Sequence, residues 1–220
     1  MTVDLTAEVI RDRLHEVERH IRAVAERPVD VVVVTKTHSG EVIRRVVEAG
    51  AVAIGENYAQ ELRNKSADIE FARECGVRTH FIGQLQTNKV RLLTGLVDCI
   101  ASVDRESLID EISKRIPGCE VHLQVNTNAE AGKGGCSPRS VPTLIRRANE
   151  GGLNVTGLMT VGPTNGSDAE TARAFRHVRE LADEHNLRVR NFGMSGDLEI
   201  AVASGSTMVR IGTAILGNRR

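Results

Sequence analysis

The sequence predicts an α/β fold, a single (β/α)8 TIM barrel with an additional N-terminal helix. Eight short apolar segments alternate with helical patterns, which is typical of parallel βαβ units. Eight strands also close such a barrel, and 220 residues lie within the about 200–250 that barrels occupy as one domain. Aromatic residues make up only 2%, so Val, Ile, Leu and Ala must build the core. A doubly wound open sheet is the alternative, because periodicity does not detect closure.

The strands are recognised as short runs of β-branched and aliphatic residues. The first contains four consecutive valines, 31–34, which is typical of a strand buried on both faces of a parallel sheet. The seventh has the weakest pattern. In chain order, the predicted strands span residues 29–34, 51–54, 79–82, 97–103, 120–126, 155–159, 188–192 and 208–211.

The helices are recognised by apolar residues at helical spacing and by their stop signals. The first, 6–27, ends before Pro28, and the next two end at Gly50 and Gly76. The later helices span 39–49, 58–75, 87–94, a segment opening at Asp104, 138–150, 168–185 and 196–203.

The two ends of the chain complete the predicted barrel. Since only about nine residues follow the last strand, little room remains for a final helix. The N-terminal helix is therefore expected to take its place on the outer ring. No linker or repeat interrupts the chain, so residues 1–220 are expected to form one domain.

Composition excludes several classes of protein. The 29 Lys+Arg balance 29 Asp+Glu without a basic block, which argues against nucleic-acid binding. No apolar run approaches the ~20 residues of a membrane span, and the N-terminus does not resemble a signal peptide. We therefore expect a cytoplasmic protein. The four cysteines form no CxxC pair, so we expect reduced thiols and no metal site; the spacing gives the zinc alternative no support.

Polar residues follow the predicted strands at their C-terminal ends, where barrels of this type place their active sites. Lys36 directly follows the most apolar strand. Partial desolvation there would lower the pKa of its amine and make it available for a Schiff base. The alternative is a lysine whose side chain only reaches the solvent at the rim.

Two glycine-containing segments suggest a site for phosphate. Residues 193–196 (Gly-Met-Ser-Gly) precede a helix, and residues 212–214 (Gly-Thr-Ala) follow the eighth strand. Glycines let backbone N–H groups approach an anion, and the loops after strands seven and eight commonly bind phosphate in barrels. Arg210, inside the eighth strand, either pairs with a carboxylate such as Glu56 or Asp197 or points at a ligand in the barrel mouth.

A Schiff-base lysine combined with a phosphate site points to pyridoxal 5′-phosphate (PLP). The segments that carry a family resemblance are Val34-Thr35-Lys36-Thr37, Gly55-Glu56-Asn57-Tyr58, His80-Phe81-Ile82-Gly83, Gln124-Val125-Asn126, Gly157-Leu158-Met159, Gly193-Met194-Ser195 and the run from Gly205 to Ala214. On these segments the chain resembles the YggS/PROSC family of pyridoxal phosphate homeostasis proteins. That family is similar to the barrel domain of alanine racemase, PLP fold type III. The resemblance extends from residue 34 to residue 217.

The resemblance implies the residues that hold the cofactor. Lys36 carries PLP as a Schiff base, and Arg210 faces the pyridine nitrogen. The remaining residues that it implies are Ser195, Gly212 and Thr213 at the phosphate, with Asn57 and Met194 lining the pocket. The chain departs from the family pattern at His38, where a second lysine is common, and at Thr79, where a tryptophan is common. These departures affect secondary binding or transfer roles.

The resemblance also implies a non-catalytic role in intracellular PLP homeostasis. A guanidinium cannot protonate the pyridine nitrogen, so Arg210 would leave the ring a weak electron sink. Racemisation also needs a second acid or base, which alanine racemases take from a C-terminal β domain; we expect this chain, ending at Arg220, to lack it. The alternative is a minimal amino-acid racemase using Lys36 as its only base. A third hypothesis is a Schiff-base aldolase on the same barrel.

The expected partners follow from this role. They are PLP itself and PLP-dependent apoenzymes as recipients, with no nucleic acid or membrane, and we expect a monomer. Lys133, in the glycine-flanked loop 130–135, is either a cation that helps to admit or release the cofactor or an ordinary solvated lysine.

Overall fold

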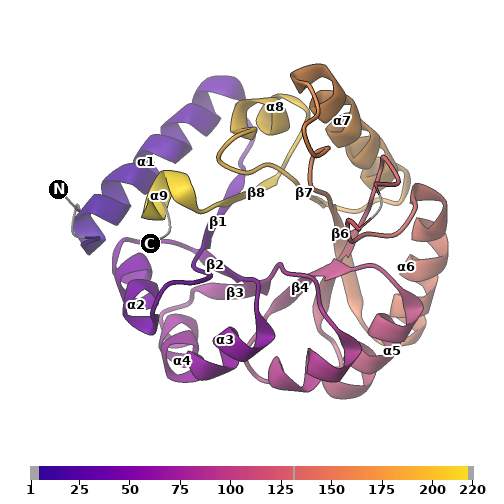
Figure 1. Ribbon diagram of the computed structural model, residues 1–220, viewed down its shortest axis with the longest axis horizontal. Coiled ribbons are helices and arrows are strands. Elements are labelled where there is room, and N and C mark those ends of the chain that lie inside the picture. Colours follow the sequence, from indigo (N-terminus) through magenta and orange to yellow (C-terminus); the bar gives the residue numbers. More distant parts are fainter. Residues whose placement is uncertain (1–4, 131, 218–220) are drawn as a thin grey trace.

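The computed structural model describes residues 5–130 and 132–217 of the chain, so both termini of the expected domain 1–220 lie outside it. Its eight parallel strands form a closed barrel in which β8 pairs with β1, and the predicted barrel is confirmed over the open sheet (Figure 1). The strands are β1 (Asp30–Val34), β2 (Ala53–Glu56), β3 (Arg78–Phe81), β4 (Cys99–Val103), β5 (Glu120–Gln124), β6 (Asn154–Met159), β7 (Val189–Asn191) and β8 (Met208–Ile211).

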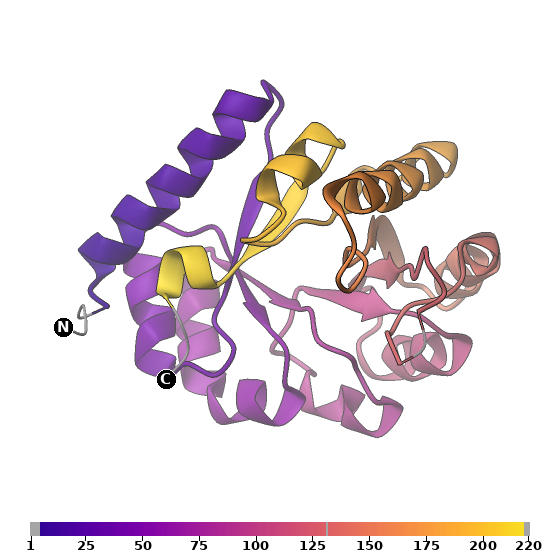
Figure 2. The same cartoon turned by 45° about the horizontal axis from the view of Figure 1, so that its top comes forward.

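Helices surround the barrel as an outer ring (Figures 1 and 2). They are α1 (Ala7–Val24), α2 (Gly40–Glu48), α3 (Ala59–Asn64), α4 (Ser66–Glu74), the 3-10 helix η1 (Thr87–Leu92), α5 (Glu106–Arg115), the 3-10 turn η2 (Pro138–Ser140), α6 (Val141–Glu150), α7 (Asp168–Glu184), α8 (Leu198–Ala203) and α9 (Thr213–Leu216). Helix α1 contacts α8, α9 and α2, and so takes the expected place in the ring. No helix in the described part of the chain is long and apolar enough to cross a membrane.

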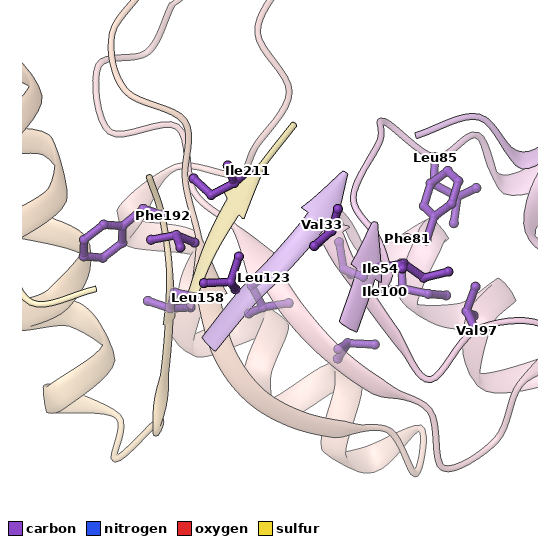
Figure 3. Packing of buried hydrophobic residues seen from close by; sticks show 14 of the residues in the cluster. Val33, Ile54, Phe81, Leu85, Val97, Ile100, Leu123, Leu158, Phe192 and Ile211 are labelled. Carbon is purple, nitrogen blue, oxygen red and sulfur yellow. The ribbon is translucent and has the colours of Figure 1, made fainter. Parts of the chain in front are cut away.

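Two layers of side chains fill the space on either side of the strands. Because successive residues of a strand point to opposite faces, Val33 joins the large apolar cluster under the helices while Val32 belongs to a small separate cluster inside the barrel. Figure 3 shows the outer layer, which takes in Ile54, Ile100 and Leu123 from neighbouring strands. This continuous aliphatic layer fixes the strands, and their C-terminal ends are thereby held around one opening.

The structure corrects several of the predicted elements, and strands β4 and β5 are each two residues shorter than predicted. Strand β2 begins two residues later than predicted, because Val52 is exposed, and it continues through Glu56, which is buried and pairs with Phe81 of β3. The predicted helix 58–75 is broken at Lys65 into α3 and α4. The predicted helix 87–94 is the 3-10 helix η1, which ends at Leu92, and the short α9 follows β8 where little room for a final helix was expected.

Candidate functional site

A cavity of about 370 Å³ opens at the C-terminal ends of the strands. Apolar side chains from β1, β6 and the turn after β3 form part of its wall, among them Val34, Ile82 and Met159. The cavity brings together all the site residues predicted from the sequence, which are Lys36, Asn57, Met194, Ser195, Arg210, Gly212 and Thr213. These residues come from four separate strand ends, so their convergence is a property of the closed barrel.

Lys36 lies directly beyond the end of β1 and is half-buried at the wall of the cavity. The preceding valines are buried, with Val33 fully so, and they hold the base of the lysine side chain in apolar surroundings. The alternative, a side chain that only reaches the solvent at the rim, stays open, because lining the cavity does not fix where the amine points. A primary amine at this position is of the kind that reacts with a carbonyl group.

The segments after β7 and β8 form another side of the cavity with exposed backbone. Gly193 has φ +108°, and a Cβ there would lie 2.5 Å from Ala201 Cβ, so only glycine fits this turn. A Cβ on Gly196 would meet no atom within 4 Å, and one on Gly212 would lie 3.5 Å from Val34 Cβ. The fold thus has room for side chains at both positions, and glycine leaves the backbone uncovered there. Such a surface, with the Ser195 and Thr213 hydroxyls beside it, suits an anion.

Arg210 is a buried cation at the floor of this cavity, only 5% exposed. Its guanidinium donates to the backbone oxygen of Asn191 at 2.8 Å, to Asn191 Oδ1, and to the backbone oxygen of Thr160 at 2.9 Å. No carboxylate in the described residues lies within ion-pair distance of it. Burial lowers the pKa of Arg210 to about 10, which still leaves it charged at neutral pH.

The carboxylates offered as alternative partners of Arg210 are engaged elsewhere. Glu56 pairs with Lys65 at 2.9 Å, so that alternative is wrong. Asp197 Oδ1 accepts the Met194 N–H at 2.6 Å, and its charge acts on Arg210 only from a distance. The ligand-directed interpretation of Arg210 is therefore the one that the geometry favours.

A hydrogen-bonded chain extends from Arg210 through the barrel interior, and the sequence reasoning missed it. Because Asn191 Oδ1 faces Arg210, its amide nitrogen faces His122 Nδ1, at 3.1 Å. His122 Nε2 then carries the proton and lies 3.5 Å from Glu120 Oε1 and 3.7 Å from Cys99 Sγ. The signal was present, since Glu120 and His122 occupy alternate positions of one predicted strand and so share its inner face.

Cys99, Glu120 and His122 also form the one metal-compatible cluster found in the described residues. The hydrogen bond from Asn191 makes His122 Nδ1 an acceptor and leaves the proton on Nε2, the nitrogen that would have to bind a metal. Burial keeps the pKa of the Cys99 thiol well above its usual value, so sulfur is a neutral thiol there. We therefore interpret these three side chains as a hydrogen-bonded group.

Asn57 lines the cavity and carries an unsatisfied buried polar atom. Its Oδ1 is buried and has no hydrogen-bond partner within the described structure. A buried amide oxygen without a partner costs free energy, and Asn57 lines the cavity as a residue. Together with the cation, the amine and the open backbone, this observation fits a ligand with an anionic end and a heteroaromatic or carbonyl-bearing body.

Two further residues named from the sequence lie in different positions. Lys133 Nζ donates to Glu130 Oε1 at 3.1 Å and to the Gly162 oxygen, so it joins two loops and is not a solvated lysine; it lines a neighbouring hollow with Gln84 and Asp104. His38 lines the main cavity itself.

Comparison with known proteins gives concordant results. The family model described as alanine racemase, N-terminal domain, matches residues 9–220. A pyridoxal phosphate homeostasis protein of Aquifex aeolicus is 39% identical over 197 residues, covering 84% of this chain and 85% of that protein. A crystal structure of an unknown protein from Bifidobacterium adolescentis aligns with a TM-score of 0.89 and 33% identity over 98% of each chain. PipY of Synechococcus elongatus, whose structure contains bound PLP, aligns with a TM-score of 0.76 and 30% identity over 94% of this chain and 100% of its own.

Proposed function

The chain belongs to the pyridoxal phosphate homeostasis proteins of the alanine racemase N-terminal domain family, and we propose that it binds PLP in the cavity at the strand ends. One observation carries this proposal: a lysine amine, a buried arginine and a cradle of open backbone and hydroxyls line the same cavity. The volume of about 370 Å³ lies in the range of small-ligand sites, about 300–1,000 Å³. The PLP seen in the relative PipY supports the same assignment.

Each lining residue has a role in this proposal. Bound PLP would supply an aldehyde that forms a Schiff base with a primary amine, and Lys36 would supply that amine. The guanidinium of Arg210 would lie at the pyridine nitrogen. The phosphate is received by Ser195, Gly212 and Thr213, and the sides of the pocket are formed by Asn57 and Met194.

The proposed role is that of a carrier, without a catalysed reaction. Arg210 stays charged, with a pKa of about 10, and donates hydrogen bonds, so it keeps an opposing ring nitrogen unprotonated and limits carbanion stabilisation. Tyr58 does not line the cavity and is 52% exposed, so no tyrosine of the described chain stands opposite Lys36 as a second acid or base. The alternative is weak racemase chemistry with Lys36 as the base.

The experiment that tests this role combines binding with proton exchange. We expect saturable PLP binding, reduced at least about tenfold in Lys36→Ala, and no exchange of amino-acid α-hydrogens with deuterated solvent. Exchange that depends on Lys36 would contradict the carrier role, and absence of PLP binding would contradict the site. Arg147→Ala, on the far surface between α5 and α6, serves as the control for both measurements.

The wider role rests on the same site. We propose that the barrel acts as one PLP-binding domain and as a monomer in the cytoplasm, with PLP-dependent apoenzymes as recipients. Transfer is tested by mixing PLP-loaded protein with an apoenzyme and following recovery of its activity. Recovery no faster than from free PLP at the released concentration would contradict delivery, and size-exclusion chromatography with light scattering tests the monomer.

A further inference from the structure

A buried ionic cluster lies outside the barrel wall, behind the ends of β1 and β2. Lys65, between α3 and α4, is 7% exposed, and Glu56 at the end of β2 is fully buried. Lys65 Nζ donates to Glu56 Oε1 at 2.9 Å, to Glu61 Oε1 at 2.5 Å and to the backbone oxygen of Thr35 at 3.2 Å. An ammonium has three protons, so the donor capacity of Lys65 is fully used.

The cluster is hydrogen-bonded to the residues on both sides of Lys36. Thr35 donates its hydroxyl to Glu56 Oε1 at 2.7 Å, in addition to the bond that its carbonyl receives from Lys65. The Thr37 N–H donates to Glu61 Oε1 at 2.6 Å. The residues before and after Lys36 are therefore bonded to two carboxylates that a single ammonium joins.

The local backbone needs such support. Thr37 has φ +65°, a left-handed conformation that a β-branched residue adopts only when its surroundings impose it. The helix predicted over 58–75 is also interrupted at Lys65, whose φ and ψ are −96° and 15°. The left-handed conformation of Thr37 and the break in the helix at Lys65 place these two residues where the cluster can form. Without the cluster, both features would lower the stability of this region.

The electrostatics make Lys65 the central member. Burial raises the pKa of Glu56, and the charge and hydrogen bond of Lys65 act against that rise. Glu56 Oε2 has no hydrogen-bond partner in the described structure, so its carboxylate depends on the contacts of Oε1. Without the ammonium, two neighbouring carboxylates would face each other with one of them fully buried.

We propose that Lys65 is a positioning residue that, through Glu56 and Glu61, fixes the backbone around Lys36 so that the Lys36 amine enters the cavity. The part of this inference that concerns the cofactor rests on the proposed PLP site. The part that concerns the backbone does not, because it is a statement about the cofactor-free chain. Lys65 itself is not among the residues that line the cavity.

The first test measures amide hydrogen exchange at Thr37 in cofactor-free protein. The variants are Lys65→Met and the double variant Lys65→Met/Glu56→Gln, which removes both buried charges and keeps the acceptor for Thr35. We expect exchange at Thr37 to become at least about tenfold faster in both. Arg44→Met, which cuts the Arg44–Asp68 bond of 2.6 Å between α2 and α4, is the matched control and should leave it unchanged. Unchanged exchange in both test variants would overturn the proposal.

The second test separates positioning from stability. We expect Lys65→Met to melt at a lower temperature and the double variant to recover most of that loss. PLP affinity and the rate at which the visible band of the bound cofactor forms should stay about tenfold lower in both. Recovery of binding together with melting temperature would show a merely structural role and overturn the proposal. If wild-type protein binds no PLP, the proposed function fails, and the exchange at Thr37 still decides the backbone claim.

Discussion

Two polar clusters lie near the cavity, and each holds a buried cation with a different kind of partner. Inside the barrel, Arg210 is held by the neutral oxygens of Asn191 and Thr160. Outside the barrel, Lys65 is held by two carboxylates. A cation without a carboxylate partner remains available to an electron-rich ligand atom, whereas a cation neutralised on all sides can only hold its neighbours. The contrast supports the two proposed roles, ligand contact for the first cluster and backbone positioning for the second.

The largest expected effect breaks the outer cluster. Lys65→Met should lower the free energy of unfolding of cofactor-free protein by about 3–5 kcal/mol, because it leaves the buried carboxylate of Glu56 without its counter-ion. Arg210→Met should cost only about 1–2 kcal/mol, since it removes hydrogen bonds but also a desolvated charge. Urea denaturation followed by circular dichroism measures both. A larger loss for Arg210→Met would contradict the contrast.

The next effect concerns the hydrogen-bonded side chains Asn191, His122 and Glu120, which extend from Arg210 into the barrel. His122→Leu should cost about 2 kcal/mol, because the amide of Asn191 and the carboxylate of Glu120 each lose a partner inside the barrel. It should also weaken PLP binding, since Asn191 then no longer holds Arg210 in one orientation. His15→Leu, on the exposed face of α1, is the control. Full stability in His122→Leu would show that the interior chain does not contribute.

A smaller effect follows from pH. The N–H of His122 and the hydrogen bonds from Thr156 and Arg78 hold the pKa of Glu120 below its usual range. The folded state therefore binds the Glu120 proton less readily than the unfolded state. Its stabilisation is present above the unfolded pKa of about 4.5 and is lost as pH falls. The stability difference between wild type and Glu120→Gln should shrink as the pH is lowered from 6 toward 3, and a constant difference would contradict the assignment.

The smallest effect tests whether burial, not charge, distinguishes these clusters. Arg147 and Asp110 form a bidentate ion pair, with Nε–Oδ1 and Nη2–Oδ2 distances of 2.8 and 3.0 Å, and both side chains are about half exposed. Exposed pairs contribute little, because water and salt screen them. Arg147→Ala should unfold at the same urea concentration as wild type within error. A loss as large as that of Lys65→Met would remove the physical basis of the comparison.

The sequence predicted those features that depend on local pattern. The valines before Lys36 indicated a buried strand, and the glycines around Ser195 and Gly212 indicated open backbone, so strand order located both segments at one end of the barrel. The two clusters depend on contacts between distant residues. His122 and Asn191 are separated by 69 positions, and no local pattern pairs them. The Glu56–Lys65 pair was not predicted for a different reason. Glu56 is polar and was therefore placed after the end of its strand, and the helical spacing continued through Lys65 without a sign of a break.

The most direct test of the central claim maps where the cofactor attaches. Protein saturated with PLP is reduced with borohydride, digested and analysed by mass spectrometry, with the visible spectrum recorded before and after reduction. If Lys36 holds the cofactor, the visible band disappears on reduction and a pyridoxyl mass increase is found on the peptide that contains Lys36. A protein that takes up no colour from PLP, or a label that maps to Lys133 or to any other lysine instead, would contradict it.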